Sequence, residues 1–475
     1  MLDTQNGRML ETIDVMRVLE EEIIQSVSGS DRTVENGMRA AISRRGFLRR
    51  TGVACAASAG APYVLTSSAL GAGPVPPPSD RITMGFVGVG SHGTGMNLRS
   101  FLGQPDAEAL AVCDVDAART ARAKDMVEKA YAGRARSGRH QGCEAVGDWR
   151  EVVARQDIDA VMISTPDHWH VPISLAAIRA GKDVICEKPT MTIHEGRALA
   201  DAVARYSAVF QMSTEDRSVS VYHRMAELVR NGWIGKLRRI RVKLPGGPGR
   251  PADAAIHPVP AGLDYDMWLG PAPWRPYRPS CLHFHFRWVR DFSGGQLTDW
   301  GAHLVDTAQW ANDTEHTGPV EVEGAGKTHA QGPYDTYHQY SLRYRYADGV
   351  EMFVESGGVG IRFEGDDGWV GNSGWRGRLE ASSPAIGRSE IGPGEVHLYT
   401  CRGGEHRNFL DCVRSRREPY FPAEIGHRCC SVLHMGNIAM DLGRKLRWDP
   451  DAERFPGDDE ANRRLSRAMR EPWTL

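Results

Sequence analysis

The amino-acid sequence predicts an α/β protein in which a doubly wound parallel sheet precedes a second domain built on a mostly antiparallel sheet. Between residues 82 and 186, short apolar runs alternate with amphipathic segments, which is the pattern of parallel strands connected by helices. From about residue 236, segments rich in β-branched and aromatic residues follow one another without long helices between them, which favours antiparallel strands. The length of 475 residues accommodates both domains after a leader.

The first 72 residues have the pattern of a removable export leader. Two arginines, Arg44 and Arg45, precede a mostly small and apolar stretch. This arrangement is typical of a twin-arginine signal, so we expect a periplasmic or otherwise exported protein. Because such leaders usually begin shortly before the arginines, we expect translation to start at Met38 and residues 1–37 to lie upstream of the true start.

Residues 81–212 carry the predicted parallel domain, and a stiff, Pro-rich linker at 73–80 joins it to the leader. Short apolar runs bounded by turn residues predict the strands, and amphipathic stretches predict the helices. The predicted strands lie at 82–89, 109–114, 160–164 and 183–186. The predicted helices lie at 94–102, 117 to about 132, and 171–180.

Residues 213–445 form the predicted second domain. Its predicted strands lie at 236–244, 340–346 and 350–355. Residues 245–292 are rich in Pro, Gly, Trp and Tyr, and a segment of that length is either an ordered lid or an interface. The polar, arginine-rich tail at 446–475 is expected to wrap the surface or a neighbouring subunit.

A strand that breaks into G-x-G-x-x-G predicts a dinucleotide site. Gly88, Gly90 and Gly93 make the tight turn, admit a pyrophosphate close to the backbone and let the next helix pack on the strand. The start of that helix offers N–H groups to phosphate, and His92 lies in the same loop. Asp114 ends the next predicted strand, where a carboxylate binds ribose hydroxyls and repels a 2′-phosphate. We therefore expect NAD rather than NADP.

A polar segment follows the strand predicted at 160–164. Thr165, Pro166 and His168 lie at its carboxyl end, which is where parallel sheets bind ligands. The alternative is a simple helix start capped by Asp167. Because His and Trp side chains there add more than capping requires, we favour binding.

Glu187 and Lys188, followed by Pro189, occupy the same edge after the next strand. Partial burial at this edge disfavours the charged form of a lysine and would lower the pKa of Lys188 towards a useful acid/base range. The alternative for Lys188 alone is an exposed surface lysine.

Asp299, His303 and Asp306 have the spacing of one helix face. A carboxylate beside an imidazole fixes its tautomer and raises its basicity, which suits proton abstraction from a hydroxyl. The alternative is a helix cap with a solvated face.

Together these segments resemble the Gfo/Idh/MocA family, which includes glucose-fructose oxidoreductase and inositol dehydrogenase. The resemblance covers roughly residues 81–445 and is carried by the glycine loop with Asp114, by T-P-D-H from Thr165, by E-K-P from Glu187 and by D-x-x-x-H from Asp299. It implies a Rossmann domain followed by an α/β domain whose open, mostly antiparallel sheet covers the cofactor cleft and often supports homo-oligomers.

The resemblance also implies roles for individual residues. Lys188 and His303 would contact the reacting hydroxyl, with His303 as the base and Asp299 beside it. Many relatives carry Gln just before the arginine equivalent to Arg217, whereas Glu215 and Asp216 precede it here. An extra carboxylate near the substrate alters which sugar is accepted, so the resemblance does not identify the sugar.

We therefore expect NAD-dependent oxidation of a secondary hydroxyl of a sugar or glycoside, with a tightly held cofactor because little free cofactor exists outside the cytoplasm. One alternative, also implied by the resemblance, is an NAD-dependent glycosidase that acts by transient oxidation, elimination and re-reduction. Another is a non-catalytic, nucleotide-bound sensor or scaffold, against which the presence of both Lys188 and His303 argues. An aromatic block fits sugar stacking and a buried interface equally well, and consists of Tyr265, Trp268, Trp274, Tyr277 and Trp288.

Composition excludes some partners. The 58 Lys and Arg residues nearly balance 60 Asp and Glu, which gives no electrostatic basis for nucleic-acid binding. Outside the leader, no apolar run has the length of a membrane-spanning helix. His283 and His285 alternate along a possible strand and could hold a metal with Asp299 or His303, but no compact ligand spacing supports one, so we expect no metal. Glu405, His406 and Asp411 are expected to be structural.

Overall fold

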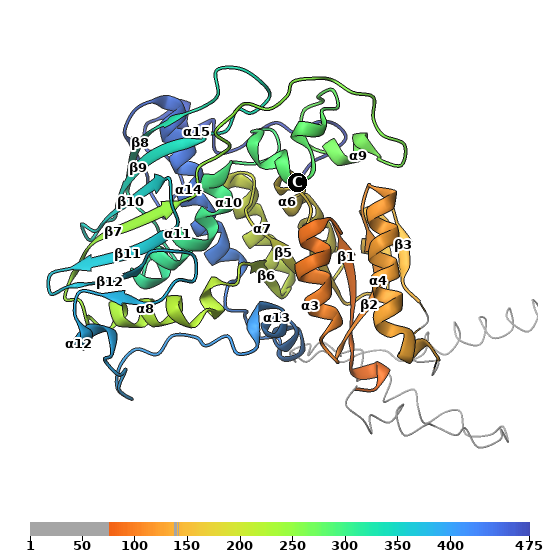
Figure 1. Cartoon of the computed structure of the whole chain (residues 1–475), viewed down its shortest axis with the longest axis horizontal. Helices are drawn as coiled ribbons and strands as arrows, with labels where there is room; N and C mark the ends of the chain where they lie inside the picture. The colour runs from red at the N-terminus through yellow and green to blue at the C-terminus, as the bar shows by residue number, and fades with distance from the viewer. Residues whose placement is uncertain (1–75, 137–139, 141) are drawn as a thin grey trace, which may run out of the picture. The chain divides into compact units, whose positions relative to one another are not determined.

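The computed structural model describes residues 76–136, 140 and 142–475. The predicted leader, the expected start at Met38 and residues 73–75 of the predicted linker therefore lie outside the described residues. Figure 1 shows a parallel sheet and a larger mixed sheet, and the two halves of the described chain meet where helices α7 (Ile193–Tyr206) and α14 (Ala423–Leu442) contact each other. This arrangement confirms the predicted two-part α/β fold.

The first sheet has six parallel strands in the order β3-β2-β1-β4-β5-β6. Neighbouring residues Phe86 and Val87 belong to separate hydrophobic clusters, because successive side chains of a strand point to opposite faces and helices cover both faces here. Double coverage explains why the inner strands of this sheet are mostly apolar runs in the sequence. The strands are β1 (Ile82–Val87), β2 (Ala107–Cys113), β3 (Glu144–Val146), β4 (Ala160–Ile163), β5 (Asp183–Glu187) and β6 (Phe210–Ser213).

The helices of this half begin close to the predicted positions, within a few residues. The glycine loop leads into a π-helix (Gly93–Leu98) that continues as α3. The α-helices are α3 (Arg99–Leu102), α4 (Ala117–Arg136), α5 (Trp149–Ala154), α6 (Asp167–Arg179) and α7. Asp148 caps α5 and Thr192 caps α7, each accepting a hydrogen bond from a backbone N–H of the first turn.

The second sheet has eight strands in the order β13-β12-β11-β7-β10-β9-β8-β14. β7 and β10 are parallel and the other pairs are antiparallel, in agreement with a mostly antiparallel sheet. The strands are β7 (Leu237–Leu244), β8 (Glu321–Lys327), β9 (Gln339–Arg345), β10 (Glu351–Ser356), β11 (Gly360–Gly365), β12 (Trp369–Asn372), β13 (Glu380–Ala381) and β14 (Leu446–Arg447).

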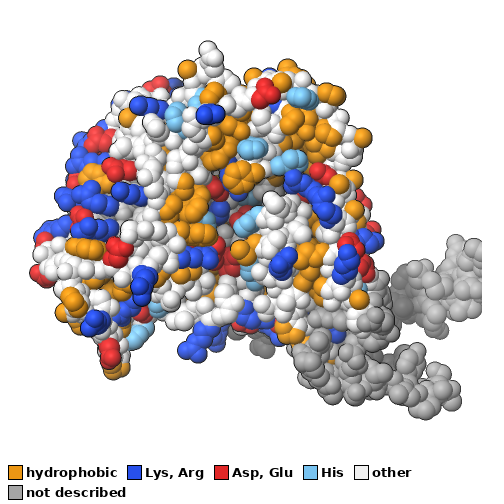
Figure 2. Space-filling model, in the orientation of Figure 1, with side chains coloured by type: hydrophobic (Ala, Val, Ile, Leu, Met, Phe, Trp, Pro, Cys, Tyr) orange, Lys and Arg blue, Asp and Glu red, His pale blue; other side chains and the backbone are white. Residues whose placement is uncertain are grey.

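Only one face of this second sheet is buried. Along β9, Tyr340, Leu342 and Tyr344 are buried while Arg343 and Arg345 are exposed, the alternation of a half-covered strand. The exposed face carries arginine–glutamate pairs, visible as mixed blue and red side chains on the left of Figure 2. The helices of this half are α8 (Ser220–Arg230), α9 (Tyr265–Leu269), α10 (Gln296–Asp299), α11 (Gly301–Ala311), α12 (Pro384–Gly387), α13 (Gly404–Ser415), α14 and α15 (Asp459–Asn462). Of these, α8, α11 and α14 contact the buried face of the sheet.

Residues 263–292, which we call the aromatic cover, form a small hydrophobic core of their own. Tyr265, Trp268, Tyr277 and Trp288 are buried in it, whereas Trp274 is 67 % exposed. The segment is therefore ordered, and most of the aromatic block packs within its own chain. It contains α9 and two short 3-10 helices, Pro279–Cys281 and His283–Trp288.

The tail at 446–475 packs against its own chain. β14 extends the edge of the second sheet, and Phe455 is fully buried. The Trp473 ring lies 4.7 Å from the ring of Trp169, and the Arg470 guanidinium donates to the Gly270 carbonyl of the aromatic cover. The cysteines of the described residues are free and buried, and no helix in this part of the chain is long and apolar enough to cross a membrane.

Candidate functional site

A cleft of about 620 Å³ lies at the carboxyl ends of β1, β2, β4 and β5, between these strands, the aromatic cover and helices α10 and α11. Figure 2 shows a hollow near the middle of the visible face, with histidine and acidic side chains in it. Parallel sheets bind ligands at this edge. The residues expected from the sequence that line the cleft are Gly88, Gly90, His92, Gly93, Asp114, Thr165, Pro166, Glu187, Lys188, Asp299 and His303.

The glycine loop forms a bare backbone cradle at one wall of the cleft. Gly88 has φ of +85°, and a Cβ there would lie 2.5 Å from the carbonyl carbon of Ser164. A Cβ on Gly93 would lie 2.1 Å from the carbonyl oxygen of Gly88. Only glycine fits these two positions, and the backbone is left open to a ligand. The cradle lies at the start of a helix, where free backbone N–H groups can bind a pyrophosphate.

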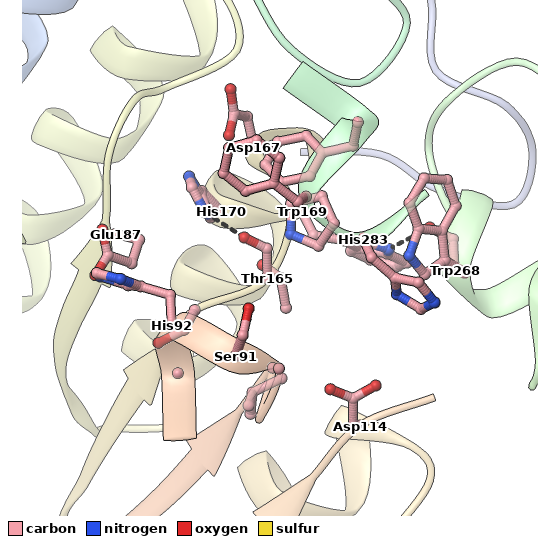
Figure 3. Close-up of a pocket in the computed structure, with 18 of the residues that line it drawn as sticks. Ser91, His92, Asp114, Thr165, Asp167, Trp169, His170, Glu187, Trp268 and His283 are labelled. Carbon is pink, nitrogen blue, oxygen red and sulfur yellow. Dashed lines mark hydrogen bonds and ion pairs between the residues drawn. The ribbon is translucent and has the colours of Figure 1, made fainter. Parts of the chain in front are cut away.

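Asp114 lies at the end of β2 on the opposite side of the cleft from Glu187 (Figure 3). Burial raises the pKa of its carboxyl to about 6. Arg119 of α4 lines the same region and forms an ion pair with Asp116 at 3.4 Å. No sequence motif marks Arg119 as a residue of the site. Its guanidinium lies close to Gly90 because the first turn of α4 carries Arg119 next to the glycine loop.

In the segment after β4, some residues line the cleft and others contact the aromatic cover. Thr165 and Pro166 line the cleft, and His170 contacts the Thr165 carbonyl at 2.8 Å, as the dashed line in Figure 3 shows. His168 does not line the cleft. It is fully buried, its Nε2 lies 3.0 Å from the Trp268 carbonyl, and burial lowers its pKa to about 3. His168 therefore anchors the aromatic cover.

Glu187 is a buried carboxylate at the centre of a polar network under the cleft. Its Oε1 lies 2.9 Å from Nε2 of His92 and accepts a hydrogen bond from Asn97 at 2.9 Å (Figure 3 shows the His92 contact). Although burial opposes ionisation, the contact with His92 holds the pKa of Glu187 well below its usual range. The Glu187 hydrogen bond in turn raises the pKa of His92. The pair therefore favours a charged carboxylate and a charged imidazole.

Lys188 keeps its charge, contrary to the lowered pKa expected from the sequence. Its Nζ donates to Oδ1 of Asp299 at 2.9 Å. Burial alone would lower the pKa of Lys188, but the carboxylates of Asp299 and Glu187 raise it above its usual value. Arg287 of the cover donates to the other oxygen of Asp299 at 3.1 Å. Although burial opposes ionisation, these two cations hold the pKa of Asp299 well below its usual range.

The carboxylate that contacts His303 is Asp216, not Asp299. His303 Nδ1 lies 2.5 Å from Oδ2 of Asp216, and because a carboxylate only accepts, Nδ1 carries the hydrogen. Trp375 donates its indole N–H to the other oxygen of Asp216 at 3.1 Å. Burial alone would raise the pKa of Asp216, but His303 holds it below its usual value. Within the described residues Nε2 of His303 has no hydrogen-bond partner, which leaves it available to a substrate.

The expected shared face of Asp299, His303 and Asp306 does not form. α10 ends at Asp299 and α11 begins at Gly301, so the helix breaks between the first two residues. Asp306 points away from the cleft and pairs with Arg217 at 2.7 Å in a fully buried contact. Because of this break, Asp299 pairs with Lys188 in the cleft, whereas Asp306 pairs with Arg217.

The histidines considered as metal ligands lie on a 3-10 helix, not on a strand. His283 lines the cleft, whereas His285 does not. Among the described residues no group of three or more His, Cys, Asp or Glu side chains has an arrangement that could hold a metal ion. Glu405 and His406 lie in the first turn of α13 and join the network under the cleft, since His406 contacts Asn97 at 3.0 Å.

Two family models match the chain. One, described as an oxidoreductase family with an NAD-binding Rossmann fold, matches residues 82–214. The other, described as an oxidoreductase family C-terminal alpha/beta domain, matches residues 249–475. The first match contains the glycine cradle and Glu187, and the second contains Asp299 and His303.

Individual proteins are similar to parts of the chain. A glycosyl hydrolase family 109 protein of Shewanella baltica is 29 % identical over 208 residues, which cover 41 % of this chain and 44 % of that protein. The match thus spans less than half the length of this curated relative.

Solved structures share the fold over most of the described chain. An aldose-aldose oxidoreductase from Caulobacter crescentus, complexed with glycerol, is 18 % identical with a TM-score of 0.57, covering 77 % of this chain and 99 % of that one. The WlbA dehydrogenase from Bordetella pertussis, in complex with NADH and UDP-GlcNAcA, is 15 % identical with a TM-score of 0.56, covering 78 % and 99 %. At this identity the likeness establishes the fold.

Proposed function

Because this chain belongs to the Gfo/Idh/MocA family of NAD-binding oxidoreductases, we propose that it oxidises a secondary hydroxyl of a sugar or glycoside with a tightly held NAD. The observation that carries the proposal is the meeting of a charged lysine, Lys188, and a carboxylate-paired histidine, His303, in the cleft that the glycine cradle opens. Solved structures of the same fold include proteins named for aldoses or bound to a sugar nucleotide, which supports a carbohydrate substrate.

The cleft suits a dinucleotide along its length. The cradle at Gly88 and Gly93 accepts a pyrophosphate on bare backbone, and Asp114 offers a carboxylate to ribose hydroxyls. Because the Asp114 carboxylate would repel a 2′-phosphate, we favour NAD over NADP. Lys188 and His303 then lie at the nicotinamide end.

The protein's own groups supply the proton transfer. A bound nicotinamide supplies the hydride acceptor. His303 takes the hydroxyl proton at Nε2, while Asp216 holds the hydrogen on Nδ1 and stabilises the imidazolium that forms. Lys188 remains an ammonium and donates a hydrogen bond to the reacting oxygen, on which negative charge develops. Asp299 fixes the position of Lys188.

A redox-neutral glycosidase is the second candidate, and two observations favour it. Curated relatives are named glycosyl hydrolase family 109 proteins. The elimination step needs a second base, and Asp167 lines the cleft with a pKa that burial raises to about 7. In this alternative, oxidation acidifies the neighbouring C–H, Asp167 removes that proton, the glycosidic oxygen leaves, water adds and the hydride returns to the sugar.

We propose that the protein is exported by the twin-arginine route with its cofactor already bound. The test is the absorbance spectrum of protein purified from the exported fraction without added NAD, before and after incubation with sugars and glycosides. A bound nicotinamide that becomes reduced with one sugar class supports the oxidoreductase. Release of reducing sugar without lasting reduction supports the glycosidase, and purification without any bound nicotinamide contradicts the captive-cofactor proposal.

A further inference from the structure

We propose that Trp375 is the wall on which the ring of a pyranoside substrate packs, and that the same indole positions the catalytic pair His303–Asp216. The inference rests on the proposed sugar chemistry and deepens it, because it names a residue that selects a cyclic substrate. Trp375 comes from the turn between β12 and β13, far in sequence from every motif of the site.

Three aromatic rings line the substrate end of the cleft. The Trp375 ring centroid lies 5.2 Å from that of Trp300 and 5.9 Å from that of His303, and the Trp300 and His303 rings are also 5.9 Å apart. Trp375 nevertheless remains 40 % exposed. A large apolar ring left open to a cleft, beside a base, is a surface that a ligand covers.

The turn that carries Trp375 is held firmly. Arg376 has φ of +57°, and its backbone N–H donates to the buried hydroxyl of Tyr222 at 2.8 Å. The Arg376 guanidinium lies 4.2 Å from the Trp375 ring and pairs with Glu215. A non-glycine residue in the left-handed region is uncommon, and here three contacts hold the turn. The indole is therefore positioned before any substrate arrives.

The aromatic cover places one exposed ring in the cleft, that of Phe284, which is 61 % exposed. Its ring contacts are with Arg287, His285 and Trp288 and not with His303. Trp268 lines the cleft, but its ring is buried among Tyr265, Phe292 and His168. Trp274 is exposed but does not line the cleft. The aromatic surface open to a substrate beside His303 is thus formed by Trp375 together with Trp300.

Pyranosides match this surface. A pyranose ring presents a flat face of C–H groups, which packs on an aromatic ring, and hydroxyl groups at its rim, which point to Lys188 and His303. An open-chain polyol has no preformed C–H face. The geometry therefore favours cyclic sugars and glycosides over acyclic polyols.

Trp375 also links substrate packing to the base. Its N–H holds Oδ1 of Asp216 while Oδ2 holds His303 Nδ1. Replacement of the indole by a phenyl ring keeps an aromatic surface but removes this hydrogen bond. The two contributions can therefore be separated by two substitutions at one position.

The test uses NADH-loaded protein and saturation-transfer NMR with methyl β-D-glucopyranoside, methyl α-D-glucopyranoside and sorbitol as probes. In the wild type we expect saturation of the ring C–H protons of a glycoside and little transfer to sorbitol. Trp375→Ala should weaken glycoside binding about tenfold. Trp375→Phe should bind within about threefold of wild type but lower kcat about tenfold, because a hydrogen bond to a charged group is lost. Trp274→Ala serves as the control and should match the wild type.

Distinct outcomes separate this inference from the proposed function. If no glycoside binds the wild type although NADH does, the proposed substrate class is wrong. If glycosides bind and Trp375→Ala binds them equally well, only the role of Trp375 is overturned. Equal losses of binding and turnover in Trp375→Phe would contradict the separate positioning role. Unchanged NADH affinity in each variant shows that the fold is intact.

Discussion

At the scale of single residues, the site divides its charges between two carboxylates. Asp299 serves Lys188 and Arg287, and Asp216 serves His303. Lys188 and Arg287 thus share one carboxylate, while His303 has a carboxylate of its own. A lysine held as ammonium donates hydrogen bonds and stabilises negative charge, while an imidazole with its Nδ1 hydrogen fixed accepts a proton at Nε2.

The Asp216→Asn substitution should lower kcat by about two orders of magnitude or more, because the amide neither stabilises an imidazolium nor fixes the tautomer of His303. Initial-rate kinetics would measure this loss of kcat, with the sugar that reduces the bound nicotinamide in the absorbance test as the substrate. NAD affinity should stay unchanged, since Asp216 does not line the cleft. The matched control is Asp125→Asn, which changes an exposed carboxylate paired with Lys129 and should retain full activity.

We expect Asp114 to give cofactor binding a pH dependence. Burial raises its pKa to about 6, and the charged form is the one that accepts hydrogen bonds from ribose hydroxyls. Below pH 6 the carboxyl is protonated before NAD binds, so the Kd for NAD should rise up to about tenfold per pH unit as the pH falls from 6 to 5. Calorimetric titration of cofactor-free protein measures this. Asp114→Asn should bind more weakly at pH 7 and lack that pH dependence, and identical pH profiles for the two proteins would refute the assignment.

At the scale of elements, buried ion pairs hold helices in place, whereas ion pairs on the exposed face of the second sheet contribute little to the free energy of unfolding. Arg217 is buried and pairs with Asp306 of α11 and with Glu315, both at 2.7 Å. Arg343 lies on the exposed face of β9, where it pairs with Glu323 at 3.1 Å. Removal of a buried partner leaves an unpaired charge without water, and removal of an exposed one does not.

Arg217→Ala should therefore cost about 3–5 kcal/mol of unfolding free energy. Arg343→Ala, the matched exposed change, should cost less than about 1 kcal/mol. Chemical denaturation followed by circular dichroism compares the two. Equal losses would show that the Arg217–Asp306 contact does not anchor α11.

Most elements of the first sheet could be predicted from sequence, because strands buried on both faces must be continuous apolar runs. The break at Trp300 could not be predicted. The spacing of Asp299 and His303 fits one helix, but the two residues lie in two short helices, and their partners Lys188 and Asp216 lie in different elements. The alternation of His283 and His285 is compatible with a possible strand, but His283–Trp288 is a 3-10 helix, because alternation over so few residues does not distinguish the two.

At the scale of the whole molecule, the site draws on distant parts of the chain. The glycine cradle, Asp114 and Lys188 follow strands of a recognisable pattern and could be found from sequence. Asp216 lies 87 residues before His303, and Trp375 lies in a turn with no local signal. Such partners are brought together by tertiary packing, which one sequence does not reveal.

The proposed export route is also tested on the whole molecule. Replacement of Arg44 and Arg45 together by Lys should retain the protein in the cytoplasm, since the twin arginines are what the route recognises. Cell fractionation followed by immunoblotting measures the distribution. Arg49→Lys, a nearby arginine outside the pair, is the control and should be exported normally. Export of the double variant at wild-type levels would refute a twin-arginine signal.

The packing of Trp473 on Trp169 has a consequence for biosynthesis. Trp169 lines the cleft, so one of its walls is supported by a residue near the end of the chain. A nascent chain still on the ribosome has the nucleotide-binding strands long before it has residue 473. The wall of the cleft at Trp169 therefore gains its support later in synthesis than the strands form, once residue 473 has been made and packed.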